Sequence, residues 1–542
     1  MKLYFLDRYC ERRKYRNIRG ILRGYRLLKA SGRLGLIRKV KREFGDTKIE
    51  AVTSVADAFF FGAAVREAEL VTRQFLLLRN AGIVLHKTLL YSIGTGNTSI
   101  VSPLPKEFRR VLVNNGFKVC QWRSTAAWAS NIFLLWCFGI VTVIKYVCCG
   151  LRRIVSTVPW PAVRYAYFVG LESNNLPRPR KDGKSYDTVT WYSRWKDAAN
   201  GLDALYHQCT GVPVSMINGM EVSFRREPFP ALADVFVLFR FLLWASGAIG
   251  WSAFDMCRGR WWYAFLLSET TRAAVTRLAN PAELAVDYLF ANSDSVYRPV
   301  WTYEAKLLGS RIVSYFYSIF EDFKLPSGYQ ANSTYWQAMN WPVYAVWDDH
   351  QKQLIKRNIR NYADVVVAGP IWLSSSPEEL PEIPHTSIAV FDTPAKKVSL
   401  HFGFSTIAEL YDSANVPIAF VRDIARALEK YGITIIYKGK RKKAVQDLHK
   451  GYIRVLKNLV EENKMVIIDA DTSPMAVIEK CKAVISMPFT STAIIGRELG
   501  KPSVYYDSSG LIQKDDRGAH GILVVSSEGE LQNWIKTVFS PE

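Results

Sequence analysis

The stretch ISMPFTSTAIIGRELGKPSVYYD, residues 485–507, joins the end of one β-rich run to the start of another through a turn and a helix. The turn after Met487 contains three hydroxyl residues in a row, Thr490, Ser491 and Thr492. An apolar helical segment then ends at Gly500, and SVYYD begins the next β-rich run. A strand, a helix and a second strand in this order indicate a βαβ unit of a parallel sheet.

The same alternation extends over the C-terminal half of the chain. Further β-rich runs lie at residues 285–295, 311–318, 342–347, 363–369, 387–392, 396–403, 433–440, 464–471, 482–487 and 521–527. Helical patterns lie between many of them and predict helices on both faces of parallel sheets. We therefore predict an α/β fold with two Rossmann-like, doubly wound domains in tandem, at residues 281–393 and 394–542. A contribution of the N-terminal part to the first domain stays open.

Ligands of open α/β sheets bind beyond the carboxyl ends of the strands. Two polar loops are expected there in the second domain. Backbone N–H groups at a helix N-terminus, hydroxyl donors and cations together suit phosphate. The predicted phosphate-binding residues are Lys438, Lys440, Arg441, Thr490, Ser491 and Thr492. The alternative is an ordinary N-cap, in which Thr490 or Ser491 only satisfies the first helical turn.

The formal net charge of +22 is concentrated near the N-terminus, because residues 1–45 contain fifteen Lys and Arg but three acids. Ile18, Ile21, Leu22, Tyr25 and Leu28 recur at helical spacing, with arginines at positions 16, 19, 23 and 26 beside them. A helix with one apolar face and basic flanks is typical of a membrane interface. The alternative is a solvated basic helix packed on the protein's own core. We predict a basic, largely helical region at residues 1–120.

Two apolar segments lie within residues 121–280, which we predict to be helical. AAWASNIFLLWCFGIVTVIKYVCC, residues 126–149, is long enough to span a bilayer and carries one charge, Lys145. FPALADVFVLFRFLLWASGAIGWSAF, residues 229–254, includes Asp234 and Arg240 and is a poor lipid-facing span. We expect both to associate with the cytoplasmic face of the inner membrane, in a peripheral or monotopic way. A hairpin of two spans and a buried helical layer are the alternatives.

Cysteine and histidine spacing shows no metal motif. The eight cysteines form no C-x-x-C pair, and the seven histidines give no H-E-x-x-H. This predicts a reducing cytoplasmic environment without structural zinc. The N-terminus is charged with no apolar run behind it, so no cleavable secretion signal is expected.

Two stretches carry a specific resemblance. MPFTSTAIIGRELGKPSVYYD (residues 487–507) and YRPVWTYEAKLLGSRIVSYFYS (residues 297–318) resemble signatures of bacterial surface-polysaccharide biosynthesis proteins named for a PFTS motif. The resemblance implies a GT-B-like glycosyltransferase, whose C-terminal domain holds a nucleotide sugar and whose N-terminal domain receives the acceptor. It implies sugar transfer to a membrane-associated O-antigen or capsule glycan.

The resemblance also bears on the donor. Many GT-B enzymes that use nucleoside diphosphate sugars carry a ribose-binding glutamate shortly before the glycine of a G-x-P motif. Here that position is Ile495, and Glu498 lies closer to Gly500. The hydroxyls at this helix resemble the phosphate grip of transferases that use CMP-activated acids. We therefore expect a CMP-linked ulosonic or nonulosonic acid, with a UDP- or GDP-sugar as the alternative.

Neither a metal nor another cofactor is expected. A CMP donor has a single phosphate, which two cationic side chains can neutralise. Asp469 and Asp471 have the D-x-D spacing that holds a metal in the other large glycosyltransferase class. With a GT-B fold, they are the end of a strand passing into a helix cap.

Sugar transfer requires a base for the acceptor hydroxyl and donors for the departing phosphate. Glu304 is the first candidate base, and Asp294, Asp349 and His350 are its rivals; each of them could instead be a cap or a surface turn. The remaining donor-side candidates are His401, Ser405 and His520. We expect the first two to contact phosphate or the donor sugar and His520 to contact the nucleotide.

Other functions have weaker support. A non-catalytic scaffold of polysaccharide assembly would keep the apolar segments but would need no phosphate loops. A nucleic-acid-binding protein would explain the charge, but no known module with basic residues and stacking aromatics is evident, so nucleic acid is not an expected partner. An epimerase would carry a glycine fingerprint and a Tyr-x-x-x-Lys pair, neither of which is found in the C-terminal region.

Overall fold

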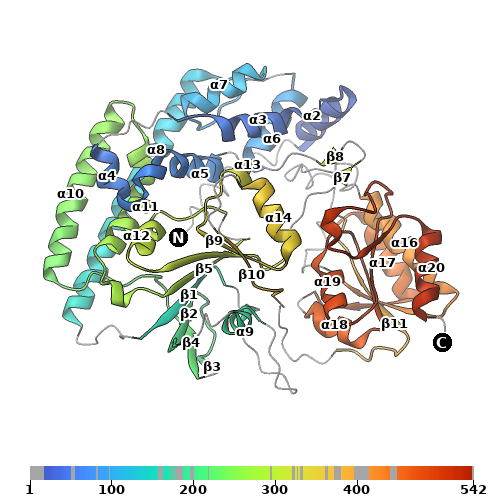
Figure 1. The fold of residues 1–542 in the computed structure, drawn as a ribbon. Coiled ribbons are helices and arrows are strands. Elements are labelled where there is room, and N and C mark those ends of the chain that lie inside the picture. The colour runs from blue at the N-terminus through green and yellow to red at the C-terminus, as the bar shows by residue number, and fades with distance from the viewer. Residues whose placement is uncertain are drawn as a thin grey trace.

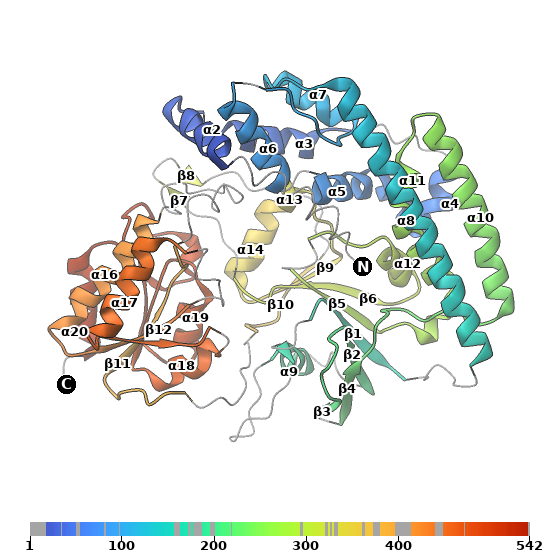
Figure 2. The ribbon, with the colours of Figure 1, turned by 180° about the vertical axis from the view of Figure 1, so that it is seen from behind.

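The computed structural model describes most of the chain. The described ranges are 18–33, 35–49, 55–80, 83–96, 98–156, 163–171, 175–176, 187–195, 201–217, 219–292, 296–319, 324–325, 328–329, 334–359, 364–371, 380–395, 414–439, 448–470 and 472–539. They form two α/β domains and a layer of N-terminal helices, which Figure 1 and Figure 2 show from opposite sides.

In the part of the chain that the structure describes, the C-terminal domain is built on a parallel sheet of six strands. Its strands, from edge to edge, are β13 (Met465–Ile468), β12 (Thr434–Lys438), β11 (Ser387–Phe391), β14 (Ala483–Ser486), β15 (Ser503–Tyr506) and β16 (Leu523–Val525). In chain order this is 3-2-1-4-5-6, so the winding reverses between β11 and β14. That order is the Rossmann-like arrangement, and the predicted doubly wound fold is confirmed.

Helices cover both faces of this sheet (Figure 1). They are α16 (Asn415–Glu429), α17 (Lys450–Glu461), α18 (Pro474–Lys480), α19 (Ser491–Glu498) and α20 (Glu528–Phe539). α16 packs against α17 and α20, and α18 packs against α19 on the opposite face. Strand β11 is apolar on both sides, because Ile388 and Val390 join one core cluster while Ala389 and Phe391 join another. Such a strand can only be central.

The predicted boundary at residues 393 and 394 is wrong. Strand β11, which we assigned to the first domain, pairs in parallel with β12 on one side and β14 on the other. The C-terminal domain therefore begins before residue 387. The β-rich run at 396–403, predicted to be its first strand, lies outside the described residues.

Within the described residues, the N-terminal sheet has eight strands. In order they are β10 (Asp364–Val367), β9 (Val343–Val346), β6 (Arg311–Tyr315), β5 (Asp287–Ala291), β1 (Tyr165–Val169), β2 (Ala204–His207), β4 (Met220–Phe224) and β3 (Ser215–Ile217). All neighbours pair in parallel except β3 with β4. Winding runs both ways from β1, and this sheet is also doubly wound.

The prediction that residues 121–280 are helical is therefore wrong for their middle part. The four strands from β1 to β4 come from residues 165–224. They belong to the same sheet as β5, β6, β9 and β10 of the predicted first domain. Strand β1 is central, between β2 and β5, and four of its five residues are buried. The N-terminal part thus contributes half of the strands described in the first domain's sheet.

Helices surround the N-terminal sheet (Figures 1 and 2). Those before β1 are α2 (Ile18–Ala30), α3 (Leu36–Asp46), α4 (Val55–Phe61), η2 (Gly62–Glu67), α5 (Ala68–Asn80), α6 (Ile83–Gly94), α7 (Lys106–Asn114) and α8 (Gln121–Val155). Those after it are α9 (Thr188–Arg194), α10 (Val235–Cys257), α11 (Trp262–Arg277), η4 (Pro281–Glu283), α12 (Trp301–Leu307), α13 (Thr334–Gln337) and α14 (Asp349–Asn358). A small hairpin joins β7 (Lys324–Leu325) to β8 (Gly328–Tyr329).

Helix α2 uses its apolar face inside the protein. Ile21 and Leu28 are buried, and α2 packs against α6. The contact is close because a Cβ at Gly24 would lie 1.9 Å from the carbonyl oxygen of Leu90. Of the two alternatives for this helix, the packed basic helix is correct. Arg19, Arg23 and Arg26 remain exposed.

Helices α8 and α10 correspond to the two predicted apolar segments. By length and composition alone, both could cross a membrane. About a third of the most apolar window of each is buried inside the protein (33%). Their packing is described below.

Candidate functional site

The PFTS turn (residues 488–491) lies at the point where the C-terminal sheet reverses its winding. Strands β11 and β14 are neighbours there, and the turn follows the carboxyl end of β14. Asp392 follows β11 and is buried, where it accepts hydrogen bonds from the hydroxyls of Tyr437 and Tyr452. Both tyrosines come from the same domain, so the end of β11 is held firmly beside the turn.

Tyr505 of β15 fixes the shape of the PFTS turn. Phe489 has a φ of 62°, in the left-handed region that costs a non-glycine residue about 1–2 kcal/mol. Its ring packs edge-on against Tyr505, with 5.7 Å between the ring centroids. The Tyr505 hydroxyl also donates to the carbonyl oxygen of Thr490 at 2.9 Å. These contacts offset the backbone cost.

The hydroxyl groups do not form an ordinary N-cap. Thr490 is the N-cap residue of α19, but its side chain accepts no hydrogen bond from the first turn. Its hydroxyl instead donates to the Met487 carbonyl oxygen at 2.9 Å and lies 3.1 Å from that of Thr492. Thr492 also lies 2.8 Å from the Ser486 hydroxyl. The N-cap alternative therefore does not describe Thr490, and the three predicted hydroxyl residues do gather at this helix start.

Lys438 is the last residue of β12, at the same edge of the sheet as the PFTS turn. It is buried, and its Nζ lies 3.4 Å from the Gly439 carbonyl oxygen. The other predicted phosphate and donor contacts, Lys440, Arg441, His401 and Ser405, lie outside the described residues.

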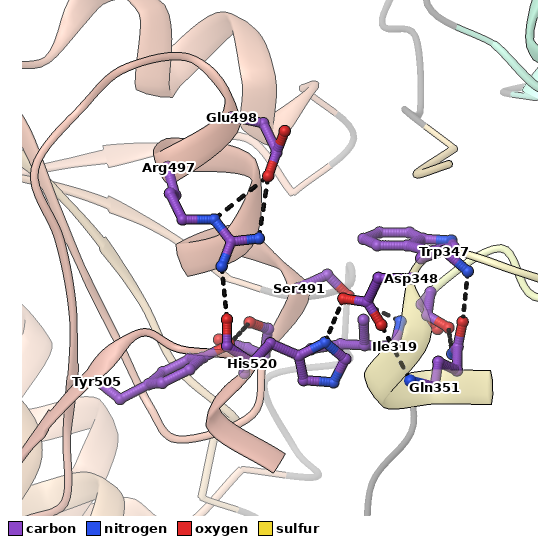
Figure 3. Close-up of polar contacts among 11 residues, drawn as sticks. Ile319, Trp347, Asp348, Gln351, Ser491, Arg497, Glu498, Tyr505 and His520 are labelled. Atoms are coloured by element: carbon purple, nitrogen blue, oxygen red, sulfur yellow. Dashed lines mark hydrogen bonds and ion pairs between the residues drawn. The ribbon is translucent and has the colours of Figure 1, made fainter. Parts of the chain in front are cut away.

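The two domains meet beside the PFTS turn (Figure 3). Ser491 accepts a hydrogen bond of 3.4 Å from the backbone N–H of Ile319, which follows β6. His520, between β15 and β16, places its Nδ1 2.5 Å from Oδ2 of Asp348, which follows β9. The carboxyl end of β14 therefore faces the ends of strands from the other sheet. This is the GT-B arrangement that the resemblance implied.

Asp348 has two tasks at this contact. Its other carboxylate oxygen accepts the Gln351 backbone N–H and caps α14. Burial raises the pKa of Asp348, but the hydrogen bond and charge of His520, with the Gln351 N–H, outweigh burial and hold the pKa below its ordinary value. Gln351 and Trp347 also hold the loop after β6, through the carbonyl oxygens of Ser318 and Phe316.

The model of the family described as polysaccharide biosynthesis PFTS motif protein matches residues 238–535, which is more than half of the chain. The chain belongs to this family. The predicted resemblance is confirmed, and the motif that names the family is the turn described above.

Solved structures resemble this PFTS-motif protein only distantly. A UDP-glucosyltransferase from Polygonum tinctorium shares 10% identity over 70% of this chain and 90% of its own, at a TM-score of 0.32. The Anabaena protein Alr3699/HepE in complex with UDP shares 10% over 69% and 89%, at 0.33. No curated protein matches significantly. The strand orders of its two sheets, given above, carry the fold of the PFTS-motif protein.

Glu304, the first predicted base, lies elsewhere in this PFTS-motif protein. It is buried in α12, 2.8 Å from Nη2 of Arg277, and it accepts the backbone N–H of Ala63 at 3.0 Å. Gly62 has a φ of 51° and leaves no room for a Cβ beside this ion pair. The geometry gives Glu304 a structural partner in the helical layer, and its catalytic role stays a prediction that these contacts do not favour.

The remaining predicted residues divide by position. Asp349 and His350 are exposed at the start of α14, and the His350 ring lies 5.0 Å from that of His520. Asp294 lies outside the described residues. Asp348 was missed, although its spacing from Gln351 is that of a capping box. Only the tertiary structure shows that its free oxygen meets His520.

Among the described residues, no three His, Cys, Asp or Glu side chains come together in a way that could hold a metal. Asp471, one member of the D-x-D triplet, is not among them.

Proposed function

We propose that this protein is a glycosyltransferase that transfers a sugar from a nucleotide-activated donor to a glycan acceptor during synthesis of an O-antigen or capsule. The position of the PFTS turn carries the proposal. It follows β14 at the reversal point of one Rossmann-like sheet and contacts the strand ends of a second one. A ligand bound there would touch both domains, as transfer from a donor to an acceptor requires.

Helix α19 supports a role for the turn in binding the donor phosphate. Its first N–H groups carry the positive end of the helix dipole, and Thr490 leaves them uncapped by its own side chain. Ser491 and Thr492 are the first residues of this helix and are half-buried, so their hydroxyls could add hydrogen-bond donors to a phosphate bound at its N-terminus. Lys438 adds a cation at the same sheet edge. Together these groups would stabilise the negative charge that develops on the departing phosphate.

The donor that this arrangement favours is a CMP-linked ulosonic or nonulosonic acid. Ile495 occupies the position where nucleoside diphosphate enzymes often place a ribose-binding glutamate, and its side chain is buried in the domain core. Glu498 is instead paired with Arg497 at 2.9 Å. A CMP-linked sugar carries a single phosphate, and the few hydrogen-bonding groups of the turn, with Lys438 at the same sheet edge, suit a single phosphate. A UDP- or GDP-sugar is the alternative.

The base would come from the acceptor side of the domain contact. Asp349 and His350 are exposed there, so a bound acceptor hydroxyl could approach either of them. Both lie at the start of α14, next to the residue that contacts the donor domain. The acceptor would then be a lipid-linked or oligosaccharide glycan held by the N-terminal domain.

Thermal unfolding of the full chain with CMP, UDP, GDP and ADP, with and without Mg²⁺, tests the proposal, because a ligand that binds only the folded state raises the Tm. We expect stabilisation by CMP. Ser491→Ala should weaken nucleotide binding by about tenfold or more, as for loss of a hydrogen bond to a charged group. Thr537→Ala removes an exposed hydroxyl on α20, and this variant should bind nucleotide as the wild type does.

Each outcome has a distinct meaning. Stabilisation by UDP or GDP alone would keep the transferase and overturn the CMP donor. Absence of any shift, together with no sugar transfer from a panel of nucleotide sugars, would favour the non-catalytic scaffold. Equal nucleotide binding by the two variants would remove the PFTS turn from the donor site.

A further inference from the structure

Helices α8 and α10 lie side by side at the outer edge of the N-terminal domain (Figures 1 and 2). Trp136 of one donates its indole N–H to the Ser252 hydroxyl of the other at 2.9 Å. Their outward surfaces expose large apolar side chains along the full length of both helices. On α8 these are Trp122, Phe133, Leu134, Val141, Ile144, Leu151 and Val155, and on α10 Val235, Phe236, Phe239, Leu242, Leu243, Trp251 and Phe254. We call this surface the apolar face.

The apolar face is far larger than a soluble monomer normally exposes. Phe236 is 82% exposed and Val155 81%, which leaves almost the whole side chain in contact with water. Isolated exposed leucines or phenylalanines need no explanation, but two adjacent helices exposing them in rows indicate a surface that another apolar phase covers.

The inward sides of the same helices are packed on the protein. On α8 the buried residues recur at helical spacing from Ser124 to Gly150. Gly139 lets α11 approach closely, since a Cβ there would lie 2.6 Å from the side chain of Leu267. Helix α8 has 35 residues and is about 50 Å long, so protein covers one side of it for more than the thickness of a bilayer core.

This packing argues against a membrane-spanning hairpin. If α8 and α10 crossed a bilayer, α11 would enter it with them. Glu269 and Arg272 of α11 are paired at 3.3 Å and would then lie at membrane depth. The one charge within the apolar part of α8, Lys145, is bound to Glu227 from the protein side. Helices that expose an apolar side and pack on the protein with the other side lie in the plane of the membrane interface instead.

Charge on the apolar face selects the kind of interface. Its exposed arginines are Arg123, Arg152, Arg240 and Arg258. Helix α8 contains no acid, and the only acid of α10, Asp255, is buried beside Arg260. Asp234 is exposed but caps α10. The guanidinium of Arg258 stacks over Phe254 and that of Arg123 over Trp122, as at a boundary between apolar and polar phases.

We propose that the apolar face docks flat on an anionic lipid bilayer, as a monotopic surface, with α8 and α10 parallel to the membrane plane. The arginines would meet lipid phosphates, and the cytoplasmic leaflet supplies the negative charge. A second copy of this chain is a poor occupant, since it would set arginines against arginines without carboxylates. The inference stands on α8 and α10 alone and does not rest on the proposed transfer reaction.

Vesicle flotation of the full chain tests the docking. We expect binding to vesicles of phosphatidylcholine with a quarter phosphatidylglycerol, and at least tenfold weaker binding to phosphatidylcholine alone. Phe236→Glu with Phe239→Glu should reduce binding to anionic vesicles at least tenfold. Met216→Glu with Leu307→Glu changes two equally exposed apolar side chains away from this surface and should have no effect. Arg240→Glu with Arg258→Glu should weaken binding, whereas Arg454→Glu with Lys457→Glu on α17 should weaken it less.

A second experiment separates flat docking from spanning. Gln121→Cys and Ser156→Cys place a thiol at either end of α8, and both positions are exposed. With protein added to sealed vesicles, a membrane-impermeant maleimide should label both thiols, as read by mass spectrometry. Protection of only one of them would overturn the flat orientation in favour of a span.

Two results would overturn the docking itself. One is equal flotation of the wild type and the Phe236→Glu, Phe239→Glu variant. The other is a wild type that does not float with vesicles and is a dimer by light scattering, while the variant is a monomer. That result would assign the surface to a second copy of the chain. An unchanged Tm of the variant without lipid would show that it is folded.

Discussion

His86 of α6 is a buried residue whose pKa predicts a measurable pH response. Burial, with the nearby charges of Lys41 and Lys87, lowers its pKa from 6.5 to about 3. The unfolded chain therefore takes up a proton below pH 6.5 that the folded protein does not. The stability from a neutral His86 is complete above pH 6.5 and is lost as the pH falls, by about 1.4 kcal/mol between pH 8 and 5.5.

Urea unfolding at pH 8 and pH 5.5 measures this loss. His86→Gln removes the titration, so we expect its free energy of unfolding to fall by about 1.4 kcal/mol less than that of the wild type over this interval. His385 is exposed, so His385→Gln supplies a histidine-to-glutamine control away from the core. Parallel curves for the wild type and His86→Gln would show that His86 is not the titrating group.

At the level of whole elements, the contact of α2 with α6 depends on glycines. A Cβ at Gly24 would meet the Leu90 carbonyl oxygen at 1.9 Å, and one at Gly94 would meet that of Gly20 at 1.9 Å. Alanine is favoured over glycine within a helix by about 1 kcal/mol. We nevertheless expect Gly24→Ala to destabilise the protein by about 1–3 kcal/mol, because the two backbones must separate.

Gly250 of α10 supplies the matched control, since a Cβ there would meet open space. Gly250→Ala should raise the Tm or leave it unchanged in the absence of lipid. Thermal unfolding of the two variants compares the effects directly. If both gain stability, α2 does not pack on α6 as described.

For the molecule as a whole, the Asp348–His520 contact couples the two domains. The pKa of Asp348 lies below the ordinary value of 3.8 in the folded protein, so its contribution is complete above pH 3.8 and is lost as the pH falls through the lower folded pKa. Asp348→Asn keeps a good N-cap but removes the charge. We expect it to lower stability at pH 7 by about 1 kcal/mol, and the difference from the wild type to shrink below pH 3.8.

Hydrogen exchange locates the effect. The amide of Ile319 should exchange faster in Asp348→Asn, because it donates across the domain contact that the charge supports, whereas the amide of Gln351 should stay protected by the retained N-cap. Asp234 is the N-cap of α10, far in sequence from the second domain. The matched variant Asp234→Asn should therefore leave the exchange of both amides unchanged. A local change confined to α14, with no effect at Ile319, would argue that the domains are not coupled through Asp348.

Most of the strands from residue 287 onward, and many of the helices between them, follow from local pattern. Short apolar runs separated by turns identify β5, β6, β9, β10 and β12 to β16 wherever their neighbours lie, because the pattern records burial on both faces. The hydroxyl residues after Met487 likewise reveal a polar helix start from sequence alone. These properties belong to contiguous residues, and one stretch of chain is enough to recognise them.

Partners distant along the chain were decided by the tertiary structure. Strand β11 has the same apolar pattern in either domain, and only its pairing with β12 and β14 assigns it to the second. Strands β1 to β4 lie in the sequence between two long apolar helices, α8 and α10, and local pattern did not predict them. The ion pair of Glu304 with Arg277 and the contact of Asp348 with His520 join residues whose sequence separation no local pattern spans. The apolar residues of helix α2 are a further example. Their helical spacing predicts that one side of the helix is buried, but it does not predict which part of the protein or which membrane buries it.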